Sequence, residues 1–298
     1  MSEKLGRVEG VVLALVALGA LVFQLWVPST HVAESDYQAV AQVLAAERQA
    51  NDVVLLVPWW TERARIYVPE GLPVVGYQGS DSDPLTRYQR VWVLSEPHLP
   101  RSGVGAWEDA FLPSRTEVGT ARNFGNLRLQ LFTNGRFKPL VVDGAELIGG
   151  AQVYLEAADG SRQACQWTGS GHRCPNGKIV SKELRDVHFA PYSCVKMEAP
   201  GGATRVVMDF VSPAAASSTL QVGYIWEYGS CIETCTPSTV WFEVNGQAQT
   251  LELKTGDETM HQLEGPPLAE GSRVRLALLS QNPTSRVVCF VLNGWGAK

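Results

Sequence analysis

The sequence predicts an α+β protein overall, built from an N-terminal transmembrane helix, a small α/β layered domain and an antiparallel, jelly-roll-like β-sandwich. Three observations support this prediction. An uncharged apolar run lies near the N-terminus, helix-like and strand-like segments alternate up to about residue 133, and short strand-like segments separated by turns follow. The expected parts are a cytoplasmic N-terminus (1–9), an anchor (10–27), an α/β domain (34–133) and a disulfide-containing sandwich (137–298).

The apolar run covers residues 10–27, and its one polar interruption is Gln24. In a helix it would span roughly 27 Å, close to the hydrocarbon thickness of a thin bilayer. Lys4 and Arg7 precede it, so the positive-inside rule predicts a cytoplasmic N-terminus and an exported body. The alternative is a cleaved signal peptide, with a candidate cleavage site at 32–35. Both interpretations place the body in the periplasm or extracytoplasmic space.

The α/β domain is predicted from a helix followed by continuous apolar runs. Ser35 is the expected N-cap of a helix that starts at Asp36 and carries one apolar stripe. The runs 53–57 and 91–94 do not alternate, which is typical of parallel strands covered on both faces. The remaining expected segments are helices over 61–67 and 106–112 and strands over 72–77, 114–119 and 127–132.

Helix signals nearly vanish after residue 133. Residues 151–156 alternate between apolar and polar and end at the turn dipeptide Asp159–Gly160. The further expected strands are 164–167, 187–190, 194–197, 206–210, 220–224, 239–245, 250–253, 273–279 and 286–293. Ten short strands with Gly- and Pro-rich turns between them predict an antiparallel sandwich.

All six cysteines lie in the second half of the chain, which indicates disulfides in an exported domain. Six cysteines allow 15 pairings, and the sequence alone does not choose among them. Short loops suggest Cys165–Cys174 and Cys231–Cys235, leaving Cys194–Cys289 as a long-range link. The alternative is zinc bound by Cys231 and Cys235, or by His172 with Cys174, but no second close pair completes a four-ligand site. We therefore expect neither metal nor cofactor.

The formal net charge is −5, and the chain contains no block of Lys and Arg residues. This composition argues against binding to nucleic acid and against charge-driven docking on anionic lipid.

Aromatic residues provide the candidate ligand contacts. Trp59 and Trp60 follow the first expected strand, at the carboxyl end where open α/β sheets hold ligands. Trp226, Glu227 and Tyr228 precede two cysteines, so a disulfide would hold an aromatic loop that suits a sugar. The alternative for both groups is ordinary packing of aromatic side chains in a core.

Catalytic motifs are absent: the sequence contains no G-x-S-x-G, no P-loop and no G-x-G-x-x-G after a strand. Glu96, His98 and Arg101 share one loop and are a candidate acid–base group. A solvated loop with two prolines explains the same residues. Whether the protein is an enzyme stays open, and the sequence favours a non-catalytic role.

Three stretches, 51–58, 90–94 and 124–132, resemble the extracytoplasmic C-terminal region of bacterial glycosyltransferases that use lipid-linked sugars, of the protein-mannosyl and aminoarabinose transferase type. The second half is similar to galactose-binding-like jelly rolls. That transferase family does its chemistry in many membrane helices, whereas this chain has one candidate helix. The resemblance therefore implies a relative of the external domain, and it assigns no catalytic residue.

Three hypotheses follow from these observations. The first is a membrane-anchored, non-catalytic protein that recognises a glycan or cell-envelope component. The second is an accessory or structural subunit that docks on a polytopic membrane protein such as a glycosyltransferase. Small residues at Gly10, Ala14 and Ala17 are the hint of helix packing. The third is a hydrolase that uses the loop with His98.

Overall fold

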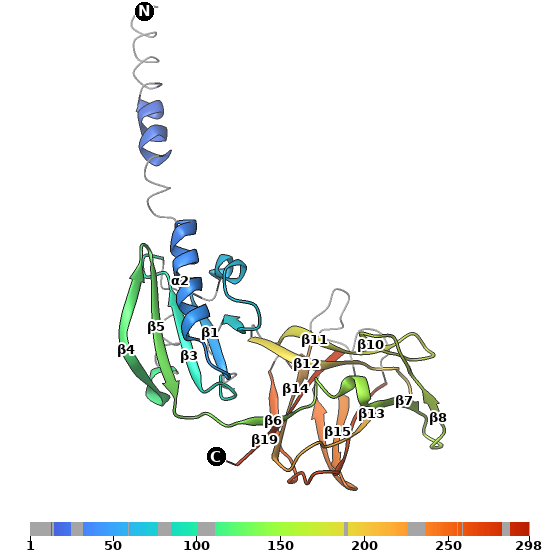
Figure 1. The fold of residues 1–298 in the computed structure, drawn as a ribbon. Coiled ribbons are helices and arrows are strands. Elements are labelled where there is room, and N and C mark those ends of the chain that lie inside the picture. The colour runs from blue at the N-terminus through green and yellow to red at the C-terminus, as the bar shows by residue number, and fades with distance from the viewer. Residues whose placement is uncertain are drawn as a thin grey trace, which may run out of the picture. The chain divides into compact units, whose positions relative to one another are not determined.

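The structure, a computed structural model, describes residues 13, 15–24, 32–58, 60–76, 85–99, 111–187, 190–225, 236–254, 256–257, 259–281 and 287–297. The chain forms two compact units, residues 1–77 with 90–135, and residues 78–89 with 136–298 (Figure 1). The first unit contains a small mixed sheet and the second an antiparallel β-sandwich. The fold is therefore mostly β, which corrects the α+β class that the sequence predicts.

The predicted anchor, residues 10–27, lies partly outside the described residues. Residue 13 and residues 15–24 are helical. Among the helices of the described part of the chain, none is both long and apolar enough to cross a membrane.

The elements of the first unit are α2 (Glu34–Glu47), β1 (Asp52–Val57), η1 (Glu62–Ile66), β2 (Val74–Gly76), β3 (Arg90–Ser95), η2 (Leu112–Ser114), β4 (Arg115–Phe124) and β5 (Leu127–Asn134). The sheet order is β2-β1-β3-β5-β4. The strands β2, β1 and β3 are parallel, whereas β5 and β4 pair antiparallel. The sheet is thus mixed because a hairpin extends its parallel half.

The apolar stripe of α2 packs on this sheet. Tyr37, Val40 and Leu44 are buried in one cluster with side chains from β1, β3 and β5. All six residues of β1 are buried, which agrees with its continuous apolar sequence. The expected cap is wrong, since the N-cap of α2 is Ala33, without a side-chain hydrogen bond.

Two expected α-helices are not formed as such, and this lowers the helix content. Residues 62–66 form a 3-10 helix between Pro58 and Pro69. Of the expected helix over 106–112, residues 106–110 lie outside the described residues, and 112–114 form another 3-10 turn. Segments this short gain too few hydrogen bonds to offset the cost of nucleating an α-helix.

The second unit contains β6 (Leu140–Asp143), η3 (Ile148–Gly150), β7 (Gln152–Glu156), β8 (Arg162–Ala164), β9 (Gln166–Trp167), β10 (Gly171–Arg173), β11 (Ile179–Val187), β12 (Ala190–Glu198), β13 (Arg205–Val211), β14 (Ser217–Tyr224), β15 (Ser238–Val244), β16 (Gln247–Leu253), β17 (His261–Glu264), β18 (Arg273–Ser280) and β19 (Val287–Trp295). One sheet has eight strands, β17-β14-β19-β12-β11-β10-β9 with β6 paired to β19. The other has six, β16-β15-β18-β13-β7-β8.

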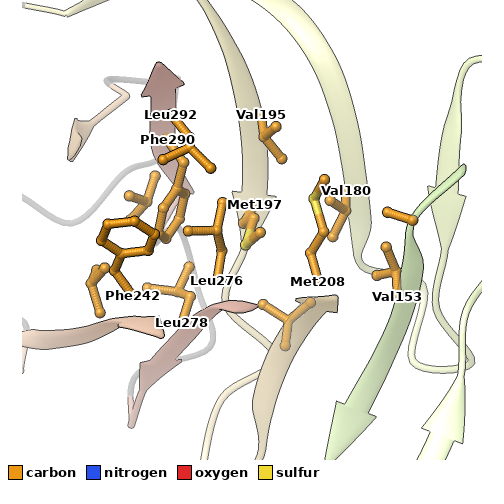
Figure 2. Close-up of a cluster of buried hydrophobic side chains, with 14 of the residues drawn as sticks. Val153, Val180, Val195, Met197, Met208, Phe242, Leu276, Leu278, Phe290 and Leu292 are labelled. Atoms are coloured by element: carbon orange, nitrogen blue, oxygen red, sulfur yellow. The ribbon is translucent and has the colours of Figure 1, made fainter. Parts of the chain in front are cut away.

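The sandwich core lies between these two sheets. Figure 2 shows Met208, Phe242, Leu276 and Leu278 of the six-stranded sheet beneath Met197 and other side chains of the eight-stranded sheet. Strand residues alternate between the two faces of a sheet, so every second residue enters the core. The intervening residues face outward.

Four strands were not expected from the sequence: β6, β10, β11 and β17. The outward residues of β11, which include Ser181, Glu183 and Arg185, are polar, so the strand lacks the apolar run that sequence patterns detect. The expected strand 187–190 covers the end of β11 and the start of β12, and residues 188–189 lie outside the described residues.

Two disulfides belong to the sandwich unit. Cys165 is bonded to Cys174, nine residues along the chain, and Cys194 is bonded to Cys289, 95 residues along the chain. Both are pairs that the spacing of the cysteines suggests, whereas Cys231 and Cys235 lie outside the described residues. Disulfides of this kind are typical of an oxidising, extracytoplasmic compartment.

Candidate ligand-binding face on the six-stranded sheet

The outward face of the six-stranded sheet carries a row of interacting side chains that the strand register brings together. Asp209 of β13 lies opposite Gln152 of β7 on one side and Arg275 of β18 on the other. Arg275 in turn lies opposite Glu243 of β15. Cross-strand neighbours on one face are close enough to interact directly. The row therefore joins four strands that are distant in the sequence.

Arg275 is the centre of this row. Its Nε donates to Asp209 Oδ1 at 2.8 Å and its Nη2 to Oδ2 at 3.1 Å, while Nη1 lies 3.6 Å from Glu243 Oε2. The hydrogen bonds to Asp209 raise the pKa of Arg275, so the guanidinium is a permanent cation. The three side chains are each about a quarter exposed, at 25, 28 and 29%. They are thus ordered by one another and still accessible to a ligand.

Tyr154 belongs to the neighbouring row of outward residues, two positions along β7 from Gln152, and it contacts Asp209. Its hydroxyl donates to Asp209 Oδ2 at 2.8 Å, and burial together with that hydrogen bond raises the pKa of Tyr154 to about 12. The other residues in the row of Tyr154 are Val207 of β13, Ala277 of β18 and the half-buried Trp241 of β15. These four side chains form an apolar strip on an otherwise charged face.

Two arginines cover the aromatic rings of this strip. The Arg162 guanidinium lies 4.7 Å from the Tyr154 ring centre, and that of Arg205 lies 5.6 Å from the Trp241 ring centre. Both bond Glu156: Arg162 Nε donates to Oε1 at 2.8 Å and Arg205 Nε to Oε2 at 2.6 Å. Burial raises the pKa of the Glu156 carboxyl, but these hydrogen bonds outweigh it, and the pKa lies below its ordinary value.

A cavity of about 800 Å³ opens on this face. Leu147 and Gly150, at η3, lie on one side of it, and the β15–β16 turn with Asn245 and Gly246 lies on another. Its polar lining consists of Gln152, Arg162, Asp209, Glu243, Asn245, Arg273 and Arg275. Volumes of about 300–1,000 Å³ are usual for small-molecule sites. The cavity and the charged row together make this face the strongest candidate site.

Most of the binding residues expected from the sequence are not among those the structure describes. Trp59, Trp226, Glu227 and Tyr228 lie outside the described residues. Trp60 is described, in the loop after β1, and is 37% exposed. It belongs to the first unit and is not part of the candidate face.

The candidate acid–base loop follows β3. The Glu96 carboxylate accepts a hydrogen bond of 3.0 Å from the hydroxyl of Tyr37, and burial together with the Glu96 charge raises the pKa of Tyr37. His98 is exposed, and Arg101 lies outside the described residues. Tyr37 also stacks on Tyr67 at 5.1 Å, so Glu96 belongs to a packed aromatic group beside α2.

The described cysteines are not available to a metal. Cys174 is bonded to Cys165, and the nearby His172 Nε2 lies 2.9 Å from the carbonyl oxygen of Ile148. Within the described ranges, no three His, Cys, Asp or Glu side chains gather as a metal site.

The residues of the outward face were missed by sequence reasoning. The signal that marks them is the alternation of Arg205, Asp209, Trp241, Glu243, Arg273 and Arg275 with apolar core positions. Each strand alone looks like an ordinary half-buried strand. Only the register of four strands, which the sequence does not reveal, brings these residues together.

No family model matches the sequence, and no curated protein matches it either. Among solved structures, the sandwich resembles carbohydrate-binding modules. A family 51 module from Clostridium perfringens, in complex with methyl-galactose, is 11% identical, with 48% of this chain and 79% of that chain covered and a TM-score of 0.25. A family 35 module from Clostridium thermocellum is 16% identical, with 39% and 86% covered and a TM-score of 0.25.

A xylan-binding module of family 15 is 8% identical, with 48% of this chain and 90% of that chain covered and a TM-score of 0.25. All three TM-scores lie below 0.5, so neither the fold nor a ligand of this chain is taken from these structures. The resemblance of the stretches 51–58, 90–94 and 124–132 to glycosyltransferase external domains stays a prediction.

Proposed function

We propose that this is a non-catalytic extracytoplasmic protein, tethered to the membrane by residues 10–27, whose jelly-roll-like sandwich recognises a glycan or cell-envelope component. The observation that carries the proposal is the outward face of the six-stranded sheet. There, the half-buried Trp241 and the buried Tyr154 lie one row of residues away from the ion-paired Asp209, Arg275 and Glu243, and these three charged residues line a cavity of about 800 Å³.

This combination suits a saccharide. Sugar hydroxyls donate and accept hydrogen bonds at fixed angles, and Asp209, Arg275 and Glu243 supply fixed acceptors and donors. Because these side chains already hold one another, little further ordering is required when a ligand binds. The ring of Trp241 is half-buried and covered on one side by the Arg205 guanidinium, and the part that remains exposed offers an apolar surface for the C–H face of a sugar ring.

The same contacts support a binding role over a catalytic one. Asp209 and Glu243 both contact Arg275, and Glu156 contacts Arg162 and Arg205. A glycosidase of the usual kind needs a carboxylic acid that is protonated near neutral pH to donate to the leaving group. Glu156 is a poor proton donor, because hydrogen bonds from two guanidinium groups stabilise its charged form and hold its pKa below the ordinary value.

The test is a binding screen with the full chain, purified in a mild detergent, on an array of bacterial and plant glycans. We expect a hit that Trp241→Ala weakens by about tenfold or more, as is typical of an aromatic residue at the centre of a binding site. The matched control is Trp167→Ala, because Trp167 is 44% exposed and lies in the same unit, on the eight-stranded sheet. Thermal unfolding of each variant separates lost binding from lost folding.

Three results would contradict this proposal. If Trp167→Ala abolishes binding and Trp241→Ala does not, the site lies elsewhere on the sandwich. If Trp60→Ala or Trp226→Ala alone abolishes binding, the tryptophans expected from the sequence form the site instead. If a well-folded chain binds no glycan at all, the proposal of glycan recognition is wrong. The hypothesis of a subunit that docks on a polytopic membrane protein then takes its place.

A further inference from the structure

The charge of the cavity on the six-stranded sheet differs from that of the chain. Its lining contains three arginines, Arg162, Arg273 and Arg275, and two acidic residues, Asp209 and Glu243, which gives 3 − 2 = +1. The whole chain has a formal net charge of −5. A cationic lining favours an anionic ligand at this face.

Of the three arginines, Arg275 is occupied by Asp209 and Glu243. Arg162 uses its Nε on Glu156, and its side chain is 52% exposed. Within the described part of the chain, the Arg273 guanidinium has no carboxylate partner, and the residue is exposed. Among the described residues that line the cavity, Arg273 is therefore the cation without a carboxylate partner.

The backbone beneath Arg273 is fixed at the start of β18. Its N–H donates to Asn245 Oδ1 at 2.9 Å, and its carbonyl oxygen accepts from the N–H of Asn245 at 2.9 Å. Asn245 also donates through Nδ2 to Ser272 Oγ at 3.1 Å. The position from which the guanidinium extends is thus set, although the side chain itself is free to meet a ligand.

We infer that the ligand is an anionic saccharide, and that Arg273 binds its charged group while the row around Arg275 and the ring of Trp241 bind the rest of the sugar. This inference rests on the proposed glycan recognition and names the class of glycan. A guanidinium donates two parallel hydrogen bonds to a carboxylate or a phosphate, a geometry that a neutral sugar does not offer.

The test compares acidic and neutral forms of the same saccharides with the full chain in detergent. The probes are oligogalacturonate and its methyl ester, phosphorylated and unphosphorylated oligomannose, and N-acetylmuramic and N-acetylglucosamine oligomers. We expect binding to be about tenfold or more tighter for the acidic member of at least one pair. The carboxylate and phosphate pairs separate the two sources of charge, and added salt should reduce the preference.

Arg273→Gln should remove this preference and leave affinity for the neutral member unchanged, whereas Arg273→Lys should keep part of it. The matched control is Arg173→Gln, since Arg173 is an exposed arginine of the same unit on the eight-stranded sheet. If both variants lose the preference for the acidic saccharide equally, the preference comes from the net charge of the protein. That result would overturn the assignment of Arg273. Thermal unfolding confirms that each variant is folded.

The outcomes separate the two claims. Neutral members bound as well as or better than their acidic partners would overturn the anionic class and leave glycan recognition standing. No binding to any member of any pair would overturn both.

Discussion

Met208 and Asp209 are consecutive residues of β13, and they lie on opposite faces of the six-stranded sheet. Met208 is fully buried among apolar side chains, whereas Asp209 joins Tyr154 and Arg275 on the outward face. The same backbone thus supports two different layers of side chains. The comparison teaches that the inward layer holds the sandwich together, while the outward layer is ordered by polar contacts and remains accessible.

The largest effect should come from the inward face. Phe242→Ala removes a fully buried ring, and we expect it to lower the free energy of unfolding by about 3–5 kcal/mol, from lost burial and the cavity left behind. Urea unfolding measures this. Affinity per folded molecule should be unchanged, because Phe242 does not reach the outward face. A loss below about 1 kcal/mol would show that the inward layer is not the stabilising one.

An intermediate effect is expected from the centre of the outward face. Arg275→Ala leaves Asp209 and Glu243 without their shared cation, and we expect the free energy of unfolding to fall by about 1–2 kcal/mol. The estimate is modest because all three groups are partly exposed to solvent. A double-mutant cycle with Asp209→Asn measures the coupling. Zero coupling would mean that the row is not held together by these contacts.

The ion pairs of Glu156 with Arg162 and Arg205 predict that the stability of the fold depends on pH. The pKa of Glu156 is lower in the folded chain than in the unfolded chain, so its ionised form stabilises the fold. This stabilisation is complete above the unfolded-state pKa of about 4.3 and disappears as the pH falls through the lower folded-state pKa. Glu156→Gln should therefore be less stable than the wild type at pH 7, and the difference should shrink as the pH falls below the unfolded-state pKa. Unfolding curves at several pH values check this, and a constant difference would contradict it.

The smallest effect on stability is expected where the outward face is exposed to solvent. Val211→Thr changes a side chain that is 59% exposed, and we expect a change within about 0.5 kcal/mol. The same substitution at Val244, which is 3% exposed on the inward face, should cost about 1–3 kcal/mol because it buries a hydroxyl. Thermal unfolding of the two variants compares the faces with identical chemistry, and equal effects would remove the distinction between them.

The sequence was informative where one residue type repeats with a local period. The segments 206–210, 239–245 and 273–279 were expected to be strands and the structure contains them, and the continuous apolar run 53–57 predicted a fully buried strand. The spacing of the cysteines suggested both disulfides seen in the described residues. The strand patterns and the Cys165–Cys174 spacing are local signals, whereas Cys194–Cys289 joins residues 95 positions apart and was suggested only as the remaining pair.

The charged face could not be predicted in the same way. It requires the register that places Asp209 opposite Arg275 and Arg275 opposite Glu243, and other strands lie between these three strands in the sequence. A shift of one residue would turn every side chain to the other face. Sequence reasoning therefore favoured tryptophans in loops, such as Trp60 and Trp226, because an aromatic residue is conspicuous without any register.

The most direct measurement is covalent mapping of the bound saccharide. A photoreactive acidic oligosaccharide would be bound to the full chain in detergent and irradiated, and the labelled peptides identified by mass spectrometry. We expect labels on peptides that contain Asp209, Trp241 and Arg273, and competition by the unmodified saccharide. Labels confined to peptides around Trp60 or Trp226 would contradict binding on the outward face of the six-stranded sheet.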